Sequence, residues 1–226
     1  LLLNSDTIVM DDAPATMVAF MRAHPEAGAL GCKLLNRDGT LQRSCGMFPT
    51  LLTELLDQTM LHVIFPIYKL GYWDYSDVRE VDWVTGACML MRRQAVEEIG
   101  GLDENIYMFC EDIDWCYRLR KAGWKVFYTP EAEVVHFKGQ SSESVLARML
   151  VIDQQSTYYF FGKHYSRWHV QALRLVTSLG VIIRSLLWAA KWLSEASRAT
   201  AKERLRAYQQ ILYRTWMDHE YVWARR

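Results

Sequence analysis

The chain has 226 residues, enough for one large domain or for one domain with an appendage, and 51% of them are hydrophobic. This share is ample for a packed core, which excludes a disordered chain, a collagen and a disulfide-stapled miniprotein. The five cysteines form no Cys-x-x-Cys pair and are odd in number, so they indicate reduced thiols rather than a zinc site or a disulfide framework.

Charge is distributed unevenly along the chain, although the formal net charge is zero. Residues 1–162 contain 14 Lys and Arg against 22 Asp and Glu, whereas residues 163–226 contain 12 against 4 and hold five of the nine tryptophans. This asymmetry predicts two regions in different surroundings. Because the chain opens on three leucines with no basic segment before them, we expect no signal peptide and expect that further sequence precedes residue 1.

The first 45 residues predict a strand, a helix and a hairpin in that order. Asp11 or Asp12 can cap a helix that has Pro14 in its first turn and runs to about residue 23. Turn residues at 36–39 separate two extended segments. The expected strands are residues 1–4, residues 28–35 and the hairpin arm at residues 40–44.

The middle of the chain has mixed signals. Leucines at 51, 52, 55 and 56 suggest a helix, and residues 71–77 a loop. Residues 81–92 are apolar but contain Gly86, which predicts one strand with a bend where the backbone approaches something closely. A short helix at residues 93–99 is expected to end at Gly100-Gly101.

Residues 111–137 complete an α/β pattern. A helix is expected at residues 111–122, with an Asp114–Arg118 pair one turn apart and Gly123 as its stop. It is followed by a strand at 124–128, a turn at Pro130 and an extended segment at 132–137. Strands that alternate with helices predict an α/β domain.

Nearly continuous helix is predicted after residue 141. Residues 172–193 are long and apolar enough to span a membrane. Arg174, Arg184 and Lys191 lie within them, however, and each charge near the centre of a span costs ~2.5–3.5 kcal/mol. We therefore expect a helix that lies in the membrane interface, with packing on the domain or on a second subunit as the alternative.

Three groups of residues could carry chemistry. Asp6 follows a strand, where a carboxylate can hold a divalent cation that bridges phosphates, although such a residue is more often part of a turn. Glu111 and Asp112 begin a helix; the helix dipole accounts for them as well as a general base facing a cleft would. His136 ends an apolar strand and is a metal ligand only if a second ligand converges on it.

Taken together, these segments resemble the inverting family 2 glycosyltransferases of the GT-A fold, especially the bacterial rhamnosyltransferase-like branch. The matching segments are Leu2-Leu3-Asn4-Ser5-Asp6-Thr7, residues 82–93, Gly101-Leu102-Asp103-Glu104, Phe109, Glu111-Asp112-Ile113-Asp114, Arg118, Gly123-Trp124, Pro130, Val135-His136 and Ser141. The resemblance covers residues 1–142 and implies the C-terminal part of a GT-A (Rossmann-like) α/β domain that holds the metal and acceptor half. Residues 143–226 form a basic, tryptophan-rich helical extension, and the family's nucleotide-binding half is expected upstream.

The resemblance implies a role for each matching residue. Asp112 is the base that deprotonates the acceptor hydroxyl, and Glu111 beside it orients donor or acceptor. Asp6 and His136 hold Mg²⁺ or Mn²⁺, which bridges the diphosphate of the donor. Asn4, which replaces the first Asp of the family's Asp-x-Asp motif, is implied to contact substrate together with Trp83, Gly86 and Arg118.

The implied activity is hexosyl transfer with inversion from a nucleotide-sugar donor, with dTDP-rhamnose as one candidate, to a glycan or polyprenyl-linked acceptor in surface polysaccharide synthesis. The enzyme is expected in the cytoplasm, peripheral on the inner face of the cell membrane through residues 163–226, with a homo-oligomer left open. The alternatives are a non-catalytic remnant that docks to a membrane or partner, and a phosphohydrolase that uses Asp6 and His136 but lacks dense Asp/His clusters. Nucleic-acid binding is not expected, because the basic residues are mixed with an apolar face.

Overall fold

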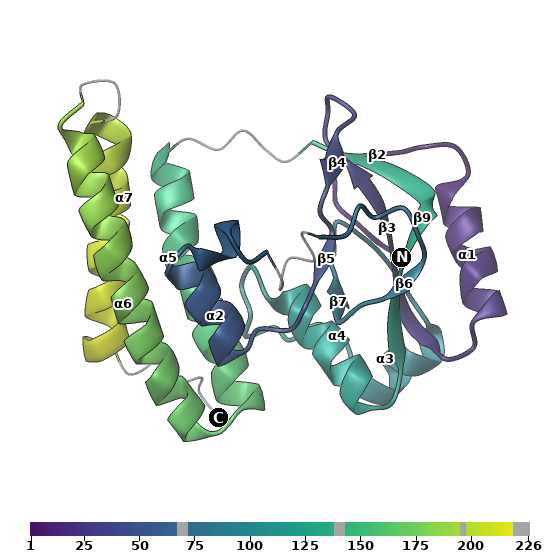
Figure 1. The fold of residues 1–226 in the computed structure, drawn as a ribbon. Helices are drawn as coiled ribbons and strands as arrows, with labels where there is room; N and C mark the ends of the chain where they lie inside the picture. Colours follow the sequence, from purple (N-terminus) through teal and green to yellow (C-terminus); the bar gives the residue numbers. More distant parts are fainter. Residues whose placement is uncertain (67–71, 138–142, 195–197, 219–226) are drawn as a thin grey trace. The chain divides into compact units, whose positions relative to one another are not determined.

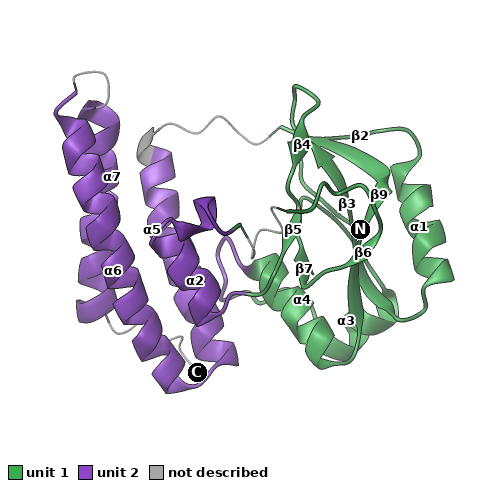
Figure 2. Ribbon diagram, viewed as in Figure 1, with its two compact units in different colours: residues 1–48, 66–104, 111–139 green, residues 49–65, 105–110, 140–226 purple. Residues whose placement is uncertain are grey.

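The computed structural model describes residues 1–66, 72–137, 143–194 and 198–218 (Figure 1). These residues form two compact units (Figure 2). Unit 1 comprises residues 1–48, 66–104 and 111–139, and unit 2 comprises residues 49–65, 105–110 and 140–226. Ser141 of the matching set, Trp223 and the first residue of the loop expected at 71–77 lie outside the described residues.

Unit 1 is built on a mixed sheet whose centre is a parallel pair, β3 (Ala27–Leu35) and β9 (Lys125–His136). The order of its main path is β1-β8-β3-β9-β2, and the outer strands run antiparallel to their neighbours. These outer strands are β1 (Leu2–Leu3), β2 (Thr7–Val9) and β8 (Cys88–Met91), with β4 (Leu41–Gln42) and β6 (Arg79–Glu80) paired beside the path. The sheet thus joins segments from both ends of unit 1.

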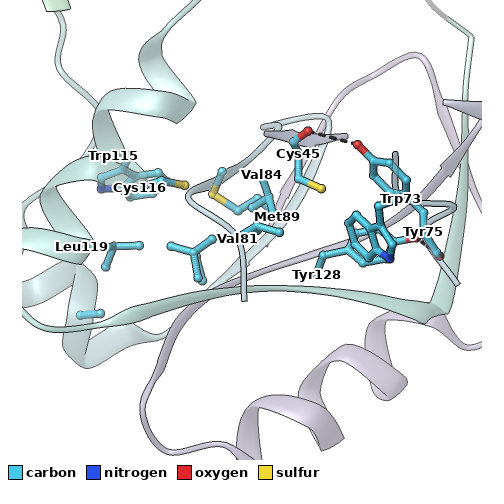
Figure 3. Close-up of a cluster of buried hydrophobic side chains, with 13 residues drawn as sticks. Cys45, Trp73, Tyr75, Val81, Val84, Met89, Trp115, Cys116, Leu119 and Tyr128 are labelled. Carbon is cyan, nitrogen blue, oxygen red and sulfur yellow. Dashed lines mark hydrogen bonds between the residues drawn. The ribbon is translucent and has the colours of Figure 1, made fainter. Parts of the chain in front are cut away.

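Both faces of this sheet are covered by apolar side chains, because successive residues of a strand point to opposite faces. On one face, Leu30 and Leu34 of β3 pack with Met17 and Phe20 of α1 (Ala13–Ala23). The other face packs against α4 (Glu111–Lys121), with α3 (Arg93–Ile99) beside it. Figure 3 shows this second cluster, which includes Trp73, Tyr75, Met89, Trp115, Cys116, Leu119 and Tyr128.

The expected α/β domain followed by helices is confirmed, as are the strand at the start of the chain, the helix α1 and the hairpin of β3 and β4. The two glycine stops are confirmed as well. Gly100 and Gly123 follow α3 and α4 with φ angles of 80° and 90°, a region that side chains with a Cβ rarely adopt.

Three local predictions were wrong. Asp12 precedes α1 but makes no side-chain capping bond, because its φ and ψ of −106° and 44° are not those of an N-cap. Residues 81–92 are two strands, not one bent strand: β7 (Trp83–Val84) pairs with β5 (Cys45–Gly46) in a separate sheet. Pro130 does not end a strand but lies inside β9, where the register with β3 shifts and the missing N–H breaks no ladder bond.

Unit 2 is helical. It contains α2 (Leu51–Gln58), the 3₁₀ turn η1 (Leu61–Val63), α5 (Glu143–His164), α6 (Arg167–Trp192) and α7 (Arg198–Met217). α6 packs against α7 and α2, and α5 packs against α7 (Figure 1). The approach of α2 to α6 is close, since a Cβ on Gly180 would lie 2.5 Å from the Gln58 Cβ. Residues 49–65 and 105–110 belong to this unit as well, so it is larger than the helical extension predicted from residue 143 onward.

Candidate functional site

Asp112 lies in the first turn of α4, where both of its carboxylate oxygens are fixed by backbone donors. Oδ2 accepts from the Gly86 N–H at 3.0 Å and Oδ1 from the Ile113 N–H at 2.8 Å. Burial raises the pKa of this half-buried carboxyl above its ordinary value, and these hydrogen bonds only partly oppose the effect. The result is a carboxylate in a set orientation that is more basic than an exposed aspartate, as a general base requires.

Gly86 lies between β7 and β8, next to Asp112. A Cβ at this position would come no closer than 3.8 Å to the Asp112 Cβ, which is an ordinary contact distance. The protein's own packing therefore does not require glycine here, and no side chain at position 86 covers the carboxylate. The close approach of protein segments occurs instead at Gly31, whose Cβ would lie 2.6 Å from the Val84 Cβ.

Glu111 is half-buried, and its Oε2 is buried without a hydrogen-bond partner in the described structure. Burial and the neighbouring charge of Asp112 raise the pKa of the Glu111 carboxyl. A buried acceptor left unsatisfied costs about 1–3 kcal/mol, so this oxygen is available to a ligand or a water molecule.

The two residues before Glu111 have left-handed backbone conformations. The φ angles of Phe109 and Cys110 are 63° and 62°, and neither residue is glycine. Such conformations cost roughly 1–2 kcal/mol per residue, and they occur preferentially at functional sites. These two conformations lie directly before α4, whose first two residues are Glu111 and Asp112.

Asp6 and His136, far apart in the sequence, are brought together by the pairing of β2 with β9. Thr7 lies opposite His136 in that pairing, and the Phe137 N–H donates to the Asp6 carbonyl at 2.9 Å. The Asp6 Oδ1 and the His136 Nε2 are 3.4 Å apart. Two ligands of one cation, each about 2.0–2.2 Å from it, lie at such a separation.

Gln42 fixes the orientation of the His136 ring. Its amide nitrogen donates to the Asn36 side chain and to the His136 carbonyl, so its Oε1, 2.7 Å from the His136 Nδ1, is the acceptor of that contact. These partners assign the proton to Nδ1 and leave the Nε2 lone pair directed toward Asp6. Metal-binding histidines are oriented by a second hydrogen bond of this kind.

Asn4 lies beside the Asp6–His136 pair, with its amide nitrogen 3.4 Å from the His136 Nε2. Within the described part of the chain, no three His, Cys, Asp or Glu side chains gather as a metal cluster. Asp6 and His136 could thus supply two ligands and leave other coordination positions to phosphate oxygens or water, a donor set that would suit Mg²⁺ or Mn²⁺; a metal site here stays a prediction.

Two other predicted contact residues are engaged by the protein. The Trp83 indole N–H donates to the Met47 carbonyl at 2.9 Å and leaves the ring half-exposed. Arg118 forms a 2.8 Å ion pair with the fully buried Asp114 and donates to two carbonyls at the end of α3. Arg118 therefore has a structural role at the junction of α3 and α4, and its contact with substrate stays a prediction.

Gln42 and Thr85 were not predicted as site residues. The Thr85 hydroxyl hydrogen-bonds to Asp112 and lowers the pKa of that carboxyl. No sequence pattern distinguishes Gln42. It is 4% exposed, whereas its apolar neighbour Leu41 is 36% exposed, the reverse of what hydropathy predicts.

Comparison with known proteins adds independent information. The family model described as glycosyltransferase-like family 2 matches residues 1–150. The N-acetylglucosaminyl-diphospho-decaprenol L-rhamnosyltransferase of Mycobacterium tuberculosis is 33% identical over 186 residues, which cover 79% of this chain and 59% of the relative. The rhamnosyltransferase WbbL of Escherichia coli is 28% identical over 165 residues, 72% of this chain and 61% of the relative. The chain thus spans about three fifths of the length of these relatives.

Proposed function

The chain belongs to glycosyltransferase-like family 2, and we propose that it forms the metal and acceptor half of an enzyme that transfers a sugar from a nucleotide-diphosphate donor. The acceptor is a glycan or a lipid-linked sugar, and the product serves cell-surface polysaccharide synthesis. Rhamnose is the candidate sugar, because both relatives described above are named as rhamnosyltransferases.

The observation that carries this proposal is the setting of Asp112, with both oxygens fixed by backbone N–H groups and with Gly86, which has no side chain, next to it. Asp112 takes the proton of the acceptor hydroxyl as that oxygen bonds to the anomeric carbon. The bond from this carbon to the diphosphate breaks, and the nucleoside diphosphate leaves. A single base on the face opposite the leaving group gives inversion, since no second carboxylate acts as a nucleophile.

Asp6 and His136 would hold Mg²⁺ or Mn²⁺, which when bound neutralises the charge that develops on the diphosphate leaving group. Gln42 holds the His136 ring through Nδ1, so that Nε2 faces Asp6. Asn4 lies beside the pair as a neutral donor for a phosphate oxygen. Glu111, with its unpartnered oxygen, orients a substrate hydroxyl, and Trp83 offers its half-exposed ring to a sugar.

The test is a transfer assay with the full-length protein, a panel of nucleotide sugars and both lipid-linked and soluble acceptors, with and without Mn²⁺. Transfer to an acceptor with inverted anomeric configuration supports the proposal. Hydrolysis of phosphate esters without transfer would favour a phosphohydrolase, and binding of acceptor with no turnover of any donor would favour a non-catalytic docking module.

We further propose that the enzyme works at the inner face of the cell membrane, held there peripherally by residues 163–226. α6 is long and apolar enough to cross a membrane by length and composition, and only 22% of its most apolar window is buried. Its exposed apolar side chains recur every three or four residues: Leu175, Leu179, Ile182 and Leu186. Three of the charges in α6 make an interfacial position less costly than a span.

Two further features support an interfacial position. Arg174 and Lys191 pack over the rings of Trp216 and Trp188, at 4.4 and 4.7 Å, and tryptophan is enriched at membrane interfaces. A second exposed apolar set in the same unit, unforeseen in the sequence, lies at η1 and its flanks and includes Val63, Ile64 and Phe65.

Vesicle flotation tests this part of the proposal. Binding is expected to require anionic lipid, because residues 163–226 carry 12 basic against 4 acidic residues and each basic residue near the surface contributes about 1 kcal/mol. It is expected to weaken in salt and after Leu175→Ser with Leu186→Ser. Absence of binding, together with a dimer that these substitutions dissociate, would assign the exposed face of α6 to a contact between copies.

A further inference from the structure

Unit 2 contains a pocket that none of the roles assigned above uses. Its volume is about 820 Å³, within the range of small-molecule sites, and it is lined by α5, α7 and residues 105–107. Part of its lining is apolar and buried, formed by Ile106, Ala147, Val151 and Ala207. A hydrocarbon group placed against these side chains would be removed from water.

The polar part of the lining is basic. Arg148, Arg206 and Arg214 line the pocket, with Glu203 as the one acidic residue in its lining. The Arg206 Nη1 donates to the Glu203 Oε1 at 2.9 Å, so one positive charge is balanced. Arg148 is exposed, and no ion pair or hydrogen bond is formed by it within the described part of the chain. The lining therefore holds three arginines against one carboxylate.

These donors are aligned in two rows. Arg148, Gln155 and Tyr159 follow one another at helical spacing along α5, and Arg206, Gln210 and Arg214 do so along α7. Guanidinium groups bind phosphate oxygens in a bidentate manner, and the neutral amides and the tyrosine hydroxyl supply further donors. Such a lining suits a ligand with several phosphate oxygens.

We propose that this pocket binds the diphosphate of a polyprenyl-diphosphate-linked acceptor, with the first isoprene units on its apolar part. The basic residues alone would suit any phosphate, but the apolar part favours a diphosphate that carries a hydrocarbon chain. Residues 105–107 line the pocket, and the same segment continues through the strained Phe109 and Cys110 into Glu111 and Asp112. The inference rests on the proposed function and names the acceptor class for it.

The experiment is isothermal titration of the full chain with farnesyl diphosphate in EDTA, so that no metal at Asp6 and His136 contributes. Arg148→Gln is expected to weaken binding 10–100-fold, the loss typical of one charge-assisted bond to phosphate. Arg148 is exposed, so the variant should fold, which circular dichroism checks. Arg22→Gln is the matched control, because Arg22 is an exposed arginine on α1 in unit 1; it should bind as the wild type does.

Three further ligands identify the source of the phosphate. Inorganic diphosphate and dTDP are expected to bind at least tenfold more weakly than farnesyl diphosphate, and anionic vesicles should not compete with it. Equal affinity for the three diphosphates, displacement by vesicles, or an Arg148→Gln variant that binds normally would each overturn the proposal. If no nucleotide sugar supports transfer while farnesyl diphosphate still binds through Arg148, the transferase proposal fails and the pocket assignment stands.

Discussion

Replacing Asp112 by Asn separates the proposed chemistry from the fold. In the variant, one oxygen becomes an NH₂ group that faces a backbone N–H, of Gly86 or of Ile113, so one hydrogen bond is lost at a cost of about 1–2 kcal/mol. Loss of the buried negative charge acts in the opposite direction at neutral pH. We therefore expect the free energy of unfolding to change by no more than about 2 kcal/mol, or a few degrees in Tm.

The effect on turnover should be much larger. Loss of a general base lowers kcat by about 10²–10⁴-fold, which is about 3–5 kcal/mol in the transition state. The assay measures kcat and KM of the full-length protein with a labelled nucleotide sugar, alongside thermal unfolding. A folded Asp112→Asn variant that keeps kcat within about tenfold of the wild type would refute the assignment of the base.

The pH dependence gives a second readout for the same residue. Because burial raises the pKa of Asp112 above 3.8, kcat/KM should rise with pH along an acid limb that lies above that value. The raised pKa also makes stability depend on pH. The stabilisation from protonated Asp112 is fully present below pH 3.8, the ordinary pKa of the group, and it is lost as the pH rises through the pKa of the folded state. An acid limb that persists unchanged in the residual activity of Asp112→Asn would assign it to another group.

Three other predictions follow from the structure, the last with a control substitution. Glu111→Gln should lower kcat less than Asp112→Asn does. It should also raise Tm at pH 8 but not below pH 4.5, because the raised pKa of Glu111 shows that burial disfavours its charged form. An unchanged Tm at pH 8 would contradict this. Gln42→Met should weaken Mn²⁺ binding 10–100-fold, measured by titration, with activity recovered at higher Mn²⁺; normal affinity would remove Gln42 from the site. Gly31→Ala should lower stability by about 1–3 kcal/mol in denaturant unfolding, whereas Gly101→Ala, with no atom within 4 Å of the added Cβ, should be close to neutral; equal effects would refute the close approach of Val84.

The sequence by itself determined the features that depend on neighbouring residues. The glycines after α3 and α4 stop these helices because a left-handed φ is a property of the residue itself. The alternation of strands and helices predicted the α/β domain, and the ordered set of motifs identified the family. Asp6, His136, Glu111 and Asp112 were singled out for the same reason, since each stands at the end of a recognisable element.

Only the tertiary structure decided the features that depend on distant segments. Gln42 orients His136 because two strands pair with β9 and β3, and nothing within a few residues of Gln42 indicates it. A Cβ at Gly86, the glycine that the sequence emphasised, would make only an ordinary contact, whereas a Cβ at Gly31 would collide with Val84 of a neighbouring strand. Residues 49–65 and 105–110 join the helical unit, and residues 105–107 form part of the basic pocket. Periodicity and turn chemistry act over a few residues, but strand register, close approach and pockets arise from pairings across the whole chain, which local patterns do not encode.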